Sequence, residues 1–82
     1  MNVLSQKKAN EVVGSNIRRR REELNLKQSE LAEKVGGTNV NISTIENGRK
    51  GITVYSLLKF AIALQCNISR LTHNLIPDEE DK

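Results

Sequence analysis

The chain has 82 residues and a formal net charge of +3, but four acidic residues lie within the last five positions, so residues 1–77 hold 12 basic and 6 acidic residues, a net +6. One cysteine and one histidine exclude an internal disulfide and a Cys/His zinc site, and they offer no catalytic constellation, so we expect no enzyme, metal or cofactor. No apolar run approaches the ~20 residues of a membrane span, and the cysteine usage is typical of a reducing, cytoplasmic setting.

The N-terminal third predicts a flexible arm followed by a helix. Residues 1–9 are polar and read as the arm, and Asn10 is a suitable N-cap for the helix. Asn25 suits the left-handed position that ends it. Gly14 is costly inside a helix, so it indicates a close approach of another helix. Within this predicted helix, the positions expected to face the core recur every three or four residues, at Val13, Ile17, Arg21 and Leu24.

Two short helices follow. The first spans 28–35 and is broken by Gly36 and its glycine neighbour. Thr38 is a good N-cap for the second, which spans 39–47 and ends at an Asn-Gly pair. No run alternates with period two, so no strand is expected here.

Two further helices complete the prediction. Residues 54–64, capped by Thr53, are apolar over so wide an arc that we place this helix at the centre of the bundle. Asn67 caps a last helix that Pro77 stops, with Ile68, Leu71, Leu75 and Ile76 on one side. The acidic residues 78–82 read as a disordered tail. The expected architecture is all-α, with five short helices in one compact domain over residues 10–77.

Residues 28–47 carry the pattern that points to function. Two short helices joined by a glycine turn form a helix-turn-helix arrangement. Ala32 is the small residue needed where the helices cross, and Gly36 suits a left-handed turn. Ile42 and Ile45 would anchor the second helix from behind.

The chain resembles the Xre, Cro and phage-repressor family of helix-turn-helix proteins. The segment LKQSELAEKVG at 26–36 is similar to the first half of the family motif, and ISTIENGRK at 42–50 to the second. With the flanking residues, the resemblance runs over about residues 13–71. It implies a compact five-helix lambda-repressor-like fold, with the second motif helix lying in the major groove of DNA.

The resemblance also implies the residues that read bases. Projection at 100° per residue places four residues opposite the two isoleucines: Val40, Ser43, Thr44 and Asn47. Asparagine pairs with adenine, and an outward valine suits a thymine methyl group, which makes Val40 the most informative position. The expected base-reading set is Asn39, Val40, Asn41, Ser43 and Thr44.

Other positions are expected to contact phosphates or to hold the motif together. Gln28 would offer a phosphate its side chain and the free N–H groups of a helix N-terminus. The remaining phosphate candidates are Lys27, Asn47, Arg49 and Lys50. Lys27 replaces the family's Ser or Thr N-cap and is read equally well as idle surface. The family implies a structural ion pair of Arg21 with Glu46, whereas Arg18, Arg19 and Arg20 are read as a solvated face or a phosphate clamp.

The expected partner is double-stranded operator DNA, bound by a homodimer with no membrane involved. Leu71, Leu75 and Ile76 are candidates for the dimer interface, with closure of the core as the alternative reading. Two recognition helices about one helical turn apart would demand a near-palindromic operator.

The expected function is sequence-specific transcriptional regulation by a cytoplasmic, nucleoid-associated bacterial or phage repressor. Three alternatives stay open: a restriction–modification controller that touches polymerase, an antitoxin that binds a toxin, and a helix-turn-helix module used only for protein–protein contact.

Overall fold

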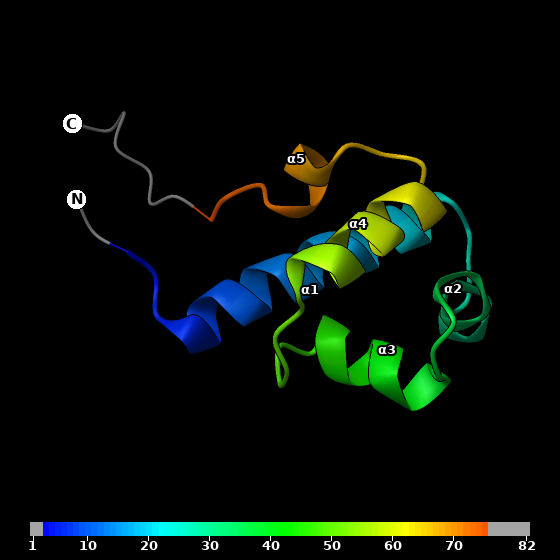
Figure 1. Cartoon of the computed structure of the whole chain (residues 1–82), viewed down its shortest axis with the longest axis horizontal. Helices are drawn as coiled ribbons and strands as arrows, with labels where there is room; N and C mark the ends of the chain where they lie inside the picture. Colours follow the sequence, from blue (N-terminus) through cyan, green and yellow to red (C-terminus); the bar gives the residue numbers. More distant parts are fainter. Residues whose placement is uncertain (1–2, 76–82) are drawn as a thin grey trace.

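The computed structural model describes residues 3–75, which form five helices and no strand. The helices are α1 (Gln6–Glu23), α2 (Gln28–Val35), α3 (Asn39–Glu46), α4 (Val54–Ala63) and α5 (Ile68–Leu71). In Figure 1, α1 runs along the molecule, with α3 below it, α5 above it and α2 at the right-hand end. The prediction of an all-α fold with five helices is confirmed.

The predicted start of the first helix at Asn10 is wrong. The N-cap is Ser5, whose hydroxyl oxygen accepts a hydrogen bond from the Lys8 amide at 3.1 Å. Asn10 lies inside α1 and accepts from the Gln6 side chain at 3.1 Å. Residues 6–9 are therefore helical and do not belong to a flexible arm. Their exposed, polar turn has no apolar periodicity, which is why the pattern missed it.

Gly14 marks a close helix crossing, as predicted. A Cβ atom at this position would overlap the carbonyl oxygen of Ile45 and would lie 2.8 Å from that of Glu46. Both oxygens belong to the end of α3, so only glycine lets α1 and α3 approach to this distance.

The core is aliphatic and is held at its edges by buried polar groups. Its buried apolar residues come from all five helices, with Ile17, Leu31, Ile42, Leu64 and Leu71 among those most completely covered. The buried Asn16 amide donates to the carbonyl oxygens of Leu71 at 3.0 Å and His73 at 2.8 Å. These bonds fix the chain after α5 against α1.

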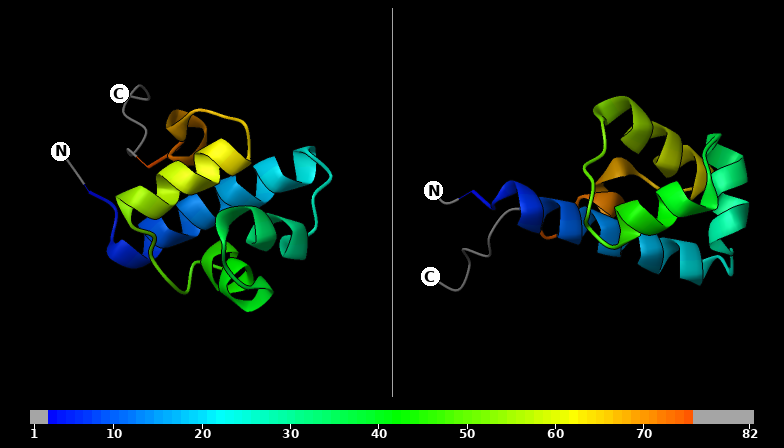
Figure 2. Two further views of the ribbon diagram at one scale, coloured as in Figure 1. Left: turned by 45° about the vertical axis from the view of Figure 1, so that its right-hand side comes forward. Right: turned by 90° about the horizontal axis from the view of Figure 1, so that it is seen from below.

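The predicted central position of the fourth helix is wrong. Figure 2 shows α4 at the edge of the molecule, where only part of its wide apolar arc meets the core. Phe60 and Ala61 are buried, whereas four large apolar residues of α4 stay in water: Val54, Tyr55, Leu58 and Ile62. A wide apolar arc indicates contact on several sides, but within residues 3–75 the contacts of α4 with α2 and α5 leave these four side chains exposed.

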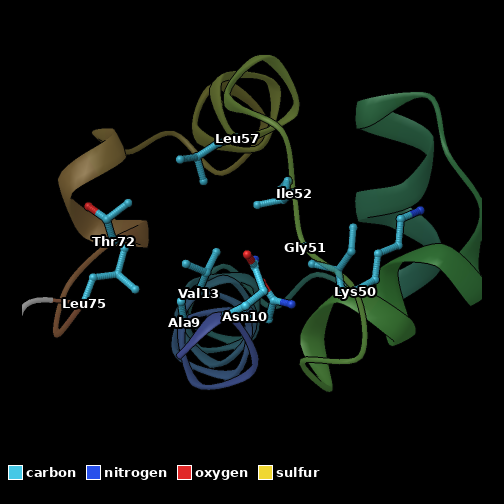
Figure 3. A pocket seen from close by; sticks show the side chains of 11 residues that line it. Ala9, Asn10, Val13, Lys50, Gly51, Ile52, Leu57, Thr72 and Leu75 are labelled. Carbon is cyan, nitrogen blue, oxygen red and sulfur yellow. The ribbon is translucent and has the colours of Figure 1, made fainter. Parts of the chain in front are cut away.

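The last helix is shorter than predicted. It ends at Leu71, and Asn74 has a left-handed φ of 72° that an α-helix cannot contain. Leu75 consequently lies outside the helix and lines a small cavity of about 220 Å³ between α1, α4 and the 49–52 loop (Figure 3). Ile76, Pro77 and the acidic tail at 78–82 lie outside the described residues.

Candidate nucleic-acid interface

The turn between α2 and α3 has the geometry that the sequence predicts. Gly36 adopts a left-handed φ of 77° at the end of α2. Thr38 caps α3, because its hydroxyl oxygen accepts from the Asn41 amide at 3.1 Å. Ile42 and Ile45 are buried, so α3 is held from one side only. Val40, on the opposite side, is exposed.

The outer face of α3 carries the five residues expected to read bases. Asn39 is exposed, and Val40 exposes 75% of its surface. Asn41, Ser43 and Thr44 are half-buried. The Thr44 hydroxyl donates to the carbonyl oxygen of Val40 at 2.9 Å, which fixes its rotamer and keeps its oxygen free to accept. Val40 is thus an apolar side chain that lies in water beside polar groups.

A buried network connects α1, α2 and α3 behind this face. Arg21 donates to both carboxylate oxygens of Glu46, at 2.7 and 3.0 Å, and to the carbonyl oxygen of Leu26 at 2.8 Å. The Glu46 side chain is 2% exposed. The hydrogen bonding that Arg21 donates to Glu46 raises the pKa of Arg21, so the guanidinium stays charged. The ion pair implied by the family resemblance is present.

Gln28 joins the same network. Its side-chain amide donates one of its two N–H groups to Glu46 at 3.0 Å. The expected phosphate contact of Gln28 would therefore use the second side-chain N–H group, together with the backbone N–H groups at the start of α2.

The other phosphate candidates lie on the surface on both sides of the motif. Lys27, Asn47, Arg49 and Lys50 are all exposed. Lys50 donates to the Asn41 side-chain oxygen at 2.7 Å, so a phosphate candidate and a base-reading candidate are in direct contact. The Asn47 amide lies 3.4 Å from the Ser43 hydroxyl oxygen. Lys27 does not cap α2 with its side chain; its amide instead donates to Glu30 at 2.7 Å.

The structure gives Arg20 a role that the sequence analysis did not propose. It donates to the carbonyl oxygens of Leu64 at 2.9 Å and Gln65 at 3.2 Å, and so satisfies acceptors left open at the end of α4. The available signal was its spacing, because Arg20 follows the core residue Ile17 by one helical turn. Arg18 instead pairs with Glu22 at 3.1 Å on the surface.

The described residues contain neither a cluster of metal ligands nor a helix able to span a membrane. Residues 3–75 contain no group of three or more His, Cys, Asp or Glu side chains placed to hold a metal ion. Within the same range, every helix is too short or too polar to cross a bilayer.

A sequence match that includes α2, the turn and α3 shows the family to which the chain belongs. A family model described as helix-turn-helix matches residues 17–71, which include α2, the turn and α3. The chain belongs to the helix-turn-helix family. The family resemblance seen in the sequence is thereby confirmed.

This helix-turn-helix protein is also similar to solved structures. It is 35% identical to the P22 c2 repressor protein, crystallised with synthetic operator 9T, over 76% of this chain and 94% of that chain, with a TM-score of 0.70. It is 26% identical to the restriction–modification controller C.AhdI from Aeromonas hydrophila, again over 76% and 94%, with a TM-score of 0.72. An iron(II) form of HppE is 28% identical over 89% of this chain and 39% of that chain, with a TM-score of 0.79. No curated protein matches the chain.

The family match, the repressor-like fold and the free outer face of α3 agree. The protein is a DNA-binding transcriptional regulator with a lambda-repressor-like helix-turn-helix fold.

Proposed function

We propose that the protein is a sequence-specific repressor that binds a near-palindromic DNA operator as a homodimer and acts by occupancy, without catalysis. The observation that carries the proposal is the outer face of α3. This face bears Val40 at 75% exposure, while Ile42 and Ile45 pin the same helix from behind. The similarity to the P22 c2 repressor, whose structure contains operator DNA, supports this assignment.

In the proposed complex, affinity for DNA and discrimination between DNA sequences come from different residues. Lys27, Arg49 and Lys50 flank the motif and would neutralise phosphates, which releases counterions and gives binding that does not depend on sequence. Asn39 to Thr44 would then discriminate between sequences, with each good base contact contributing ~1–3 kcal/mol. The Arg21–Glu46 pair sets the orientation of α3, so it acts on specificity through geometry.

The test is the double substitution Val40→Ala and Thr44→Ala. We expect the preference for operator over random duplex to fall by at least about tenfold, because two base contacts are lost, while binding to random duplex stays the same. Val3→Ala is a matched control, since Val3 is 86% exposed and lies outside the motif. Equal operator preference in the double variant and the wild type would refute the base-reading assignment. Titration of both duplexes by fluorescence anisotropy gives the comparison.

A restriction–modification controller is the second candidate, favoured by the 26% identity to C.AhdI. A controller would bind the same kind of site but would also activate, by touching polymerase. Transcription in vitro from promoters with the operator placed upstream or overlapping separates the two. A repressor lowers transcript from the overlapping site alone, whereas a controller also raises transcript from the upstream site. An antitoxin would instead copurify with a toxin, and a protein–protein module would show little sequence preference.

A further inference from the structure

Lys50 follows α3 in the chain, yet its side chain contacts the first turn of that helix. Its ammonium group donates a hydrogen bond of 2.7 Å to the side-chain oxygen of Asn41. The stem of Lys50 lines the cavity between α1, α4 and the 49–52 loop, and Figure 3 shows its nitrogen atom turned away from that cavity. A hydrogen bond with a charged donor is stronger than one between neutral groups. The bond therefore ties the loop after α3 to the turn of α3 that is expected to read bases.

This bond determines which part of the Asn41 amide is available to a partner. An ammonium group has only donors, so the amide oxygen and not the amide nitrogen must face Lys50. The nitrogen lies next to the turn between α2 and α3, where a Cβ atom added at Gly37 would be 3.7 Å from it. Asn41 therefore presents its N–H groups, while its oxygen already accepts from a positive charge.

The two side chains together form a set of hydrogen-bond donors at one flank of α3. The ammonium group of Lys50 has three N–H donors, of which its bond to Asn41 uses one. Lys50 is exposed and Asn41 is half-buried, so both border the solvent. We call them the Lys50–Asn41 pair. The pair offers adjacent N–H donors and one positive charge.

Among the four bases, guanine has the major-groove edge that matches two adjacent donors. Guanine presents two acceptors, N7 and O6, whereas adenine presents one acceptor and an amino donor. Thymine presents one acceptor and a methyl group, and cytosine an amino donor. The amino group of adenine would meet the ammonium group of Lys50, donor against donor. This opposes the pairing of asparagine with adenine that is expected when the amide oxygen is free.

We infer that Lys50 and Asn41 jointly read one guanine in each half of the operator, with one N–H donor on O6 and another on N7. The inference rests on the proposed operator binding. It adds base reading to the phosphate neutralisation proposed for Lys50, and it replaces adenine by guanine as the base that Asn41 contacts.

The test is Lys50→Met, which removes the charge and keeps an unbranched side chain. Arg49→Met is the matched control, because it removes a cation from the neighbouring exposed position. Sequences are selected from a random duplex pool, and the base pair read by Asn41 is the one at which Asn41→Ala abolishes preference. Circular dichroism verifies that the three variants keep their helices.

We expect the wild type and Arg49→Met to enrich guanine at that base pair. In Lys50→Met the preference for guanine over adenine at the same base pair should fall at least about tenfold and shift toward adenine, because the Asn41 oxygen is released to accept from the adenine amino group. Preferences at the other base pairs should stay unchanged.

Base analogues check the atoms that make the contact. Replacing this guanine by 7-deazaguanine removes the N7 acceptor and should lower wild-type affinity at least about fivefold, since one base contact is lost. Hypoxanthine keeps N7 and O6 and lacks only the minor-groove amino group, so it should bind as guanine does. Fluorescence anisotropy with the modified duplexes measures both.

Three results would overturn the inference. Lys50→Met could weaken all sequences equally with every preference intact, which would make Lys50 a phosphate contact alone. Asn41→Ala and Lys50→Met could change preference at different base pairs, or the wild type could enrich adenine where Asn41 reads. A wild type that enriches no sequence at all would instead refute the proposed function, and the inference with it, so the two failures are distinguishable.

Discussion

At the scale of single residues, one buried ion pair holds the end of α3 against α1. Arg21 and Glu46 join the first and third helices, and Gln28 adds a bond from the second. A pair buried this completely contributes more to positioning than to net stability, because removing both charges from water is costly. Removing only one partner has a different effect, because the other charge is left uncompensated.

Arg21→Ala therefore destabilises the fold strongly. We expect a loss of about 3–5 kcal/mol in the free energy of unfolding, because the Glu46 carboxylate is 2% exposed and loses its main partner. Urea denaturation measures the change. Arg18→Ala is the control, since its pair with Glu22 lies in water and should be worth less than about 1 kcal/mol. Equal losses in the two variants would contradict the structural role of Arg21.

Glu23 gives the stability of the protein a dependence on pH. Hydrogen bonding to Arg20, with a further contribution from Arg70, lowers the pKa of Glu23 below its ordinary 4.5. A carboxyl group whose pKa is lower in the folded state stabilises the fold at pH values above its ordinary pKa. This stabilisation is lost as the pH falls through the folded-state pKa. The melting temperature of the wild type should thus exceed that of the Glu23→Gln variant at about pH 7. The difference should shrink as the pH falls below the ordinary pKa of 4.5. A gap that is equal at both pH values would exclude this linkage.

At the scale of helices, the sequence predicts best those elements whose ends carry strong local signals. Thr38, Thr53 and Gly36 act as caps or turn residues where expected, and α2 and α3 match to within one residue. The start of α1 was missed because its first turns face water and have no apolar period. The end of α5 was missed because apolar spacing continues to Leu75 after the backbone has turned at Asn74.

Tertiary geometry explains the remaining errors. The pattern of α4 shows how much of the helix is apolar, but it does not show which part of that surface packs against the other helices. The contacts of Arg20 and Gln28 join residues far apart in the chain, and periodicity describes only neighbours. The positions on α3 were predictable, because helical projection and the two isoleucines define an outward face without any long-range information.

Gly14→Ala tests the crossing of α1 and α3. Its methyl group would overlap the backbone of Ile45 and Glu46, which cannot move without shifting α3. We expect a loss of about 1–3 kcal/mol from overpacking, together with weaker operator binding. Gly37→Ala is a matched control, because the nearest atom to its added carbon is 3.7 Å away. Thermal denaturation would contradict the close crossing if the two variants were equally stable.

At the scale of the whole molecule, charge and shape divide the work of binding DNA. The excess charge of residues 1–77 is basic, and the exposed cations Lys27, Arg49 and Lys50 precede α2 or follow α3 in the chain. Phosphate contacts position a protein on the duplex, and under the proposed function the α3 side chains would select the sequence.

Arg49→Ala should weaken binding uniformly across sequences. Because each phosphate contact contributes about −0.9 to the slope of log affinity against log salt concentration, removing one contact makes this slope less steep by about 0.9. Lys50→Ala should lower it similarly and also reduce operator preference, because Lys50 holds Asn41 at 2.7 Å. Affinities measured for operator and random duplex over a series of salt concentrations separate the two effects. An Arg49→Ala variant that loses preference for the operator would show that Arg49 reads bases.

The most direct test of the account is selection of bound sequences from a random duplex pool by the unmodified protein. We expect enrichment of one sequence in two inverted halves, with centres about one helical turn apart, or 10–10.5 base pairs. Such a result requires two α3 helices presented to the same face of the DNA. Recovery of the pool without enrichment, or of single unpaired half-sites only, would contradict the account.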